Sequence, residues 1–135
     1  MVKIYKTTDR IPVKIDTLTF KISPLSFDQK AEIQAMLISG DAMSVVKAAK
    51  TSVKYAVKDV TGVENADGSK YQLEFEGEVL ADHCVDDLLN IDQDDKLSLV
   101  CTSFLNGIPK DFVDPQTGKK ISGITIQRES SRKKK

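Results

Sequence analysis

The chain has 135 residues, of which 40% are hydrophobic, 30% charged and 6% aromatic, as expected for one globular domain with a mainly aliphatic core. No segment approaches the ~20 consecutive apolar residues of a membrane-spanning helix, and the N-terminus lacks the apolar stretch of a secretory signal. These features predict a protein without a membrane anchor.

Charge is unevenly distributed although the net charge is zero. Residues 1–60 carry 10 Lys or Arg against 6 Asp or Glu, residues 61–96 carry 2 against 11, and residues 97–135 carry 8 against 3. A segment of one sign is usually a solvated face, but it also steers partners of the opposite charge.

The two cysteines, Cys84 and Cys101, lie 17 positions apart in segments that we expect to be helical. Because there is no CxxC pair, buried reduced thiols are a simpler interpretation than a disulfide or a metal site. This use of cysteine favours a reducing compartment.

Alternation of apolar and polar residues predicts strands in segments 2–6, 13–15 and 18–22, with a turn at Asp16 and Thr17. Lysines occupy the polar positions of these segments. We therefore expect a small antiparallel unit with one face toward the core and the lysines in water.

A helix is expected directly after Pro24, which ends the last of these strands. Ser26 and Gln29, three positions apart, form the pattern of a capping box for a helix over Phe27–Ser39. Gly40 is expected to end this helix, because glycine tolerates the left-handed conformation of a helix C-terminus.

A second helix is predicted over residues 42–60, with Asp41 as its N-cap and Gly62 at its end. Its apolar residues recur at spacings of three and four, which is the helical period. This stripe consists of Val46, Ala49, Val53, Val57 and Val60.

The middle of the chain begins with a polar loop and continues with an extended segment over 71–76. Two further helices are predicted over 83–90 and 93–106, with Asp82 and Asp92 as their N-caps. The inner stripe of the last helix consists of Leu97, Val100, Cys101, Phe104 and Leu105.

The fold class predicted by this order of elements is α+β. An N-terminal antiparallel hairpin or small sheet is followed by a bundle of about four helices, with a short middle strand. We expect residues 1–109 to form a single domain and residues 110–135 to form an extended or disordered arm with a basic end, in which 121–126 is a candidate strand.

No catalytic, cofactor-binding or metal-ligating residues are expected, and the chain is not expected to be an enzyme. His83 and Cys84 are adjacent in a predicted helix, so their side chains point in different directions. Segments 65–68 and 92–95 imitate calcium-binding loops but lack the required ligands at the other positions.

The chain ends in Arg132, Lys133, Lys134 and Lys135. Such a basic end can contact phosphate backbones, but a solubilising tail is the simpler interpretation. Nucleic-acid binding is disfavoured, because the acidic middle repels a polyanion and no stacking aromatic residues accompany the cations.

The order of elements resembles that of the tail assembly chaperones of long-tailed bacteriophages. The resemblance spans roughly residues 17–109 and concerns the order of elements and short sequence segments rather than an invariant chemical motif. It rests on ISPLSF at 22–27, VKDVTGV at 57–63, YQLEF at 71–75 and LNGIP at 105–109.

This resemblance implies a protein of the host bacterial cytoplasm that binds the tape measure protein, keeps it soluble and helps to recruit tail tube subunits. It also implies a tendency to form homo-oligomers. A structural component of the virion, such as a head–tail or tail connector, is the main alternative. A small nucleic-acid-binding regulator is the second.

A chaperone for a helical client needs an apolar groove with a charged rim. We expect the helices at 27–39, 42–60 and 93–106 to supply the groove and the acidic segment 64–95 to supply the rim. The candidate client-binding residues are Val46, Val53, Phe104 and Leu105, for each of which a place in the core is the competing interpretation.

Overall fold

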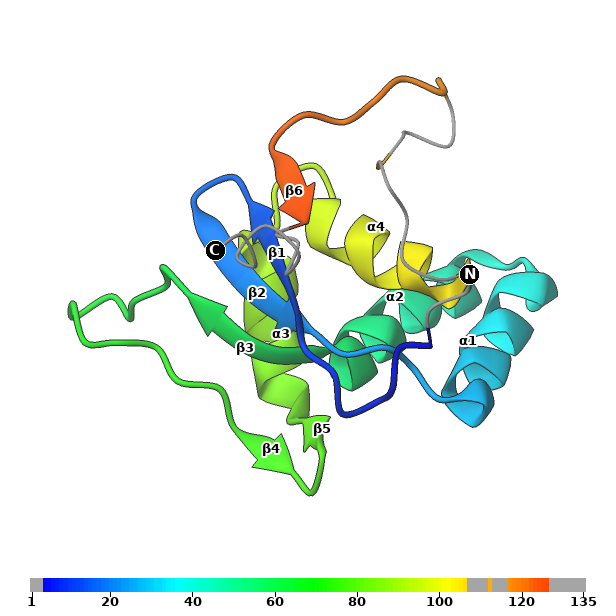
Figure 1. The fold of residues 1–135 in the computed structure, drawn as a ribbon, viewed down its shortest axis with the longest axis horizontal. Coiled ribbons are helices and arrows are strands. Elements are labelled where there is room, and N and C mark those ends of the chain that lie inside the picture. Colours follow the sequence, from blue (N-terminus) through cyan, green and yellow to red (C-terminus); the bar gives the residue numbers. More distant parts are fainter. Residues whose placement is uncertain (1–3, 107–111, 113–116, 127–135) are drawn as a thin grey trace.

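The structure is a computed structural model that describes residues 4–106, 112 and 117–126 (Figure 1). Within these residues it contains two antiparallel sheets and four α-helices, which is the predicted α+β class. The predicted N-terminal hairpin is present and consists of β1 (Ile11–Ile15) and β2 (Leu18–Ile22).

The larger sheet has four strands in the order β3-β2-β1-β6, in which β3 is Val57–Thr61 and β6 is Ile124–Ile126. Every neighbouring pair is antiparallel. Alternate residues of β1 and β2 are buried, whereas Lys14 and Lys21 are exposed, so one face of the hairpin is apolar and the other is wet.

Four helices follow the hairpin: α1 (Phe27–Ser39), α2 (Ala42–Ala56), α3 (Asp82–Ile91) and α4 (Lys96–Ser103). A single 3₁₀ turn, Phe104–Asn106, continues α4. Apolar residues of the sheet and of all four helices form one core, and α1 packs mainly against α2 at the right of Figure 1.

The capping signals of α1 are confirmed. The Ser26 hydroxyl accepts a hydrogen bond from the Gln29 backbone N–H at 3.2 Å, and the Gln29 side chain accepts one from the Ser26 N–H at 3.0 Å. Gly40 ends the helix with φ of 77°.

The prediction of helix through residue 60 is wrong, because α2 ends at Ala56 and the chain continues as β3. Val57 pairs with Ile22 and Val60 pairs with Phe20, with a shift of register between those pairs. This irregularity puts both valines in the core at a spacing of three, which imitates the helical period.

The two acidic caps also differ from prediction. Asp82 is the first residue of α3, and the N-cap is Ala81. The last helix begins at Lys96 rather than at residue 93, but the Asp92 carboxylate still accepts hydrogen bonds from the backbone N–H groups of Leu97 and Ser98, at 2.8 and 3.3 Å. Asp92 therefore caps α4 from outside the helix.

The predicted extended segment 71–76 is a strand only at its end, where β4 (Phe75–Glu76) pairs with β5 (Val79–Leu80). Residues 4–6 of the predicted first strand are not in a strand, and residues 2 and 3 lie outside the described residues. The start of the chain therefore contributes less to the sheet than its alternation predicts.

The sheet extends beyond the predicted domain boundary at residue 109, because β6 pairs with β1. Gly123 lies directly against the turn between β1 and β2: its carbonyl accepts a hydrogen bond from the Asp16 N–H at 2.7 Å, and a Cβ would meet the Asp16 carboxylate at 2.3 Å. Residues 107–111 and 127–135, including the basic end, lie outside the described residues.

Replacing Ser26 with alanine removes one half of the capping box. We expect Ser26→Ala to lower the free energy of unfolding by about 1 kcal/mol, because one N–H of the first turn loses its partner. Urea unfolding followed by circular dichroism measures this change. The same substitution at the exposed Ser122 should leave the unfolding midpoint unchanged, and an equal loss there would contradict the capping role.

Candidate protein-binding surfaces

The four residues predicted to contact a client occupy two different environments. Val46 is 50% exposed, near the start of α2. Val53, Phe104 and Leu105 are buried in the core, with exposures of 0, 3 and 7%. The prediction that these three contact a partner is corrected, since they cannot do so unless the core opens.

Helix α1 has two apolar sides. Ile33 is buried and Met36 half-buried on the side toward the core. Residues 27, 31, 35 and 38 lie on another side at spacings of four, four and three, and all are exposed. Phe27 is 83% exposed and Ile38 is 84% exposed, so the second apolar side faces solvent.

Further exposed apolar residues follow after Gly40, in the first turns of α2. We call this set the α1–α2 apolar surface. It consists of Phe27, Leu37, Ile38, Met43, Val45 and Val46. These residues lie on two helices that pack against each other, and several exposed apolar residues on neighbouring helices are a candidate protein interface, whereas single exposed apolar residues are not.

The acidic segment is largely engaged within the molecule. Lys54 pairs with Asp82 at 3.0 Å, and Lys50 pairs with Asp86 at 3.3 Å, joining α2 to α3. The hydroxyl of Tyr71 donates to Asp87 at 2.7 Å. These pairs are exposed and each contributes little to stability, but they reduce the charge that α3 offers to a partner as the predicted rim.

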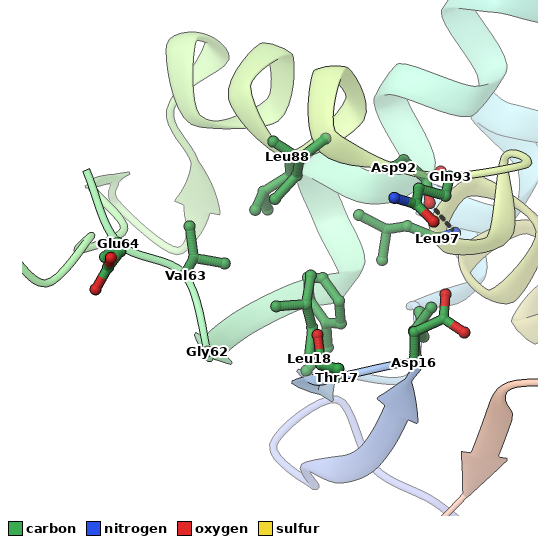
Figure 2. A pocket seen from close by; sticks show the side chains of 13 residues that line it. Asp16, Thr17, Leu18, Gly62, Val63, Glu64, Leu88, Asp92, Gln93 and Leu97 are labelled. Atoms are coloured by element: carbon green, nitrogen blue, oxygen red, sulfur yellow. Dashed lines mark hydrogen bonds between the residues drawn. The ribbon is translucent and has the colours of Figure 1, made fainter. Parts of the chain in front are cut away.

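A pocket of about 460 Å³ lies where the turn between β1 and β2 meets the end of β3 and the loop between α3 and α4. Figure 2 shows Leu18, Val63, Leu88 and Leu97 around this space, with Glu64 on one side and Asp92 on the other. Its walls therefore combine an apolar centre with acidic flanks.

Burial raises the pKa of the Asp92 carboxyl above its ordinary value, with a smaller contribution in the same direction from the charge of Asp95. The hydrogen bonds from Leu97 and Ser98 and the charge of Lys96 act in the opposite direction. A second acidic group, Asp16, is paired with Lys96 through two contacts of 3.0 and 3.1 Å.

A second pocket, of about 590 Å³, lies between the segment before β1, the start of α1 and the β4–β5 hairpin. Arg10 and Lys58 both line it, and burial together with the Arg10 charge lowers the pKa of Lys58. Glu78 lies on the same wall and partly offsets these cations.

The residues weighed for chemistry lie apart. His83 is exposed, 3.4 Å from the Glu74 carboxylate, whereas Cys84 is buried and its sulfur accepts from the Glu74 N–H. Cys101 is also buried and free, and burial raises its pKa, which makes an inert thiol. Within the described residues there is no cluster of three or more potential metal ligands and no helix suited to cross a bilayer.

Neither the family models nor the curated proteins nor the solved structures contain a match to this chain. The surfaces themselves are therefore the basis for a functional proposal. Of the α1–α2 apolar surface, the sequence predicted only Val46 as a binding residue, although the spacing of residues 27, 31, 35 and 38 indicates a second apolar side of α1.

A matched pair of valine substitutions separates core from surface. We expect Val53→Ala to lower the free energy of unfolding by roughly 2 kcal/mol, because it leaves a cavity in the core. Val46→Ala should change it by less than about 0.5 kcal/mol, because that side chain is half-exposed. Chemical denaturation measures both, and equal losses would contradict the assignment.

The raised pKa of Asp92 predicts a pH dependence of stability. The folded protein holds this proton more tightly than the unfolded chain does, so the contribution of Asp92 to the free energy of unfolding falls as pH rises from the ordinary Asp value of 3.8 through the raised value of the folded state. An Asp92→Asn variant does not titrate at this position. The stability of the variant relative to the wild type should therefore rise across this interval, as measured by urea unfolding at each pH, and a fall would contradict the raised pKa.

Proposed function

We propose that the chain is a tail assembly chaperone of a long-tailed bacteriophage and acts in the cytoplasm of the host bacterium. It binds the tape measure protein, keeps it soluble during tail morphogenesis and helps to recruit tail tube subunits. The observation that carries this proposal is the α1–α2 apolar surface, together with the resemblance in the order of elements.

The chemistry of this surface suits a helical client. Side chains at spacings of four, four and three on α1 present one stripe along the helix, and a second amphipathic helix packs against such a stripe through its own apolar side. Because α2 supports α1 from the other side, the stripe is held in place before the client arrives.

Charged residues lie beside the stripe and favour a particular kind of client. Lys47, on α2, is exposed beside Met43 and Val46. Asp28 and Glu32 are exposed on α1 and flank the outer stripe on one side. A client helix with charged residues bordering its apolar side would find partners of opposite sign here, which fixes orientation more than affinity.

Co-expression with the tape measure protein of the same phage tests the proposal. We expect the wild-type chain to increase the soluble fraction of the tape measure protein. The double variant Phe27→Gln/Ile38→Gln should lose this effect and weaken binding on the order of tenfold, because two exposed apolar side chains leave the interface.

The matched control replaces another phenylalanine and isoleucine that are exposed outside the surface, Phe75 and Ile4. The variant Phe75→Gln/Ile4→Gln should keep the client soluble as the wild type does. A client that is equally soluble with and without the chain would refute the chaperone function. Recovery of the chain in purified virions would instead indicate the structural role.

A further inference from the structure

We propose that the pocket between the β1–β2 turn and the α3–α4 loop binds a basic segment of a partner protein, with one apolar side chain of that segment inserted between two cations. This site is separate from the α1–α2 apolar surface. In Figure 1 the end of β3 lies at the left and α1 at the right. The inference does not depend on the function proposed above.

The centre of the pocket is suited to an apolar side chain. Leu18 and Val63, which are half-buried, and Ile91, which is 45% exposed, form the accessible part of the wall. Leu88 and Leu97 lie behind them in the core and are at most 1% exposed, so the wall is fixed by packing. A volume of about 460 Å³ falls within the range of specific binding sites and accommodates one large aliphatic or aromatic side chain.

The flanks of the pocket select for positive charge. Its described lining contains three carboxylates, from Asp16, Glu64 and Asp92, and no Lys, Arg or His. Asp16 is paired with Lys96, and Glu64 is exposed. Asp92 already accepts hydrogen bonds from the Leu97 and Ser98 N–H groups, and each of its oxygens keeps a further lone pair that a cation can approach. Asp94 and Asp95 follow the lining residue Gln93 directly in the chain and add acidic charge to this loop. A cation beside the half-buried Asp92 would offset the unfavourable burial of its charge.

The placement of the two available carboxylates favours a peptide. Glu64 and Asp92 lie on different sides of the apolar centre in Figure 2 and come from separate segments. A ligand that satisfies both must place a cation on each side of an apolar group. A polypeptide with the pattern basic–apolar–basic does this through successive side chains, and the acidic flanks would raise its rate of association at low salt.

Titration of the purified full chain with short peptides, followed by methyl NMR, tests this inference. The probe is the capped pentapeptide Lys-Lys-Leu-Lys-Lys, and its controls replace leucine by serine or all lysines by glutamate. We expect the first peptide to shift the methyl signals of Leu18, Val63 and Ile91. The serine and glutamate peptides should bind at least about threefold more weakly, because the first lacks the apolar side chain and the second lacks the cations.

Two single substitutions distinguish the effect of a carboxylate at the pocket from the effect of the net charge of the protein. Glu64→Gln should weaken binding of the lysine–leucine peptide on the order of twofold to threefold. Glu78→Gln, the same change at an exposed site outside this pocket, should leave the affinity unchanged. Both side chains are exposed, so neither substitution should impair folding.

Three results would overturn the inference: no shift at the pocket methyls, equal binding of the acidic peptide, or equal effects of the two glutamine variants. A further probe is the peptide of residues 127–135, which has basic residues but no apolar one. It should bind no better than the serine peptide. Tighter binding than that of the leucine peptide would assign the pocket to the end of the chain itself and would also refute the proposal.

Discussion

Packing of one apolar sheet face against the helices is the constraint on which the other features depend. Val13, Phe20, Ile22 and Val57 supply strand residues to this contact and are all at most 2% exposed. The other face of the hairpin is exposed to water, so the helices pack on one side of the sheet only. Helices α2, α3 and α4 form the layer on that side. Helix α1 reaches the core through Ile33 and is otherwise held chiefly by α2. Its second apolar side is therefore left to solvent.

Local signals in the sequence predicted much of this arrangement. Hydrogen bonds within a few residues decide where α1 begins, so Ser26 and Gln29 were sufficient to place its start, and Gly40 to place its end. The β1–β2 hairpin was equally readable, because alternation and a turn at Asp16 are local properties. Burial of Leu97, Val100 and Cys101 followed from spacing alone.

Features that depend on distant partners were not predictable in this way. Val57 and Val60 continue the spacing of α2, and only their pairing with β2 makes them a strand. The pairing of β6 with β1 joins residues more than 100 positions apart, so nothing near Ile124 indicates it. The buried positions of Val53, Phe104 and Leu105 show the same limit. An apolar stripe indicates that one side of a helix is buried, but it does not indicate whether that side packs within the same chain or against a partner.

The two candidate surfaces differ in how they would recognise a partner. At the α1–α2 apolar surface the apolar residues are exposed and the fold supplies only support, so recognition there depends on area and helical spacing. In the pocket the apolar wall rests on the core and the carboxylates lie at its flanks, so recognition depends on charge around one inserted side chain. The same core holds both surfaces in place, because α2 supports α1 and because Leu88 and Leu97 are buried behind the pocket. A partner at either surface would therefore meet a preformed site, and this chain would lose little conformational entropy on binding.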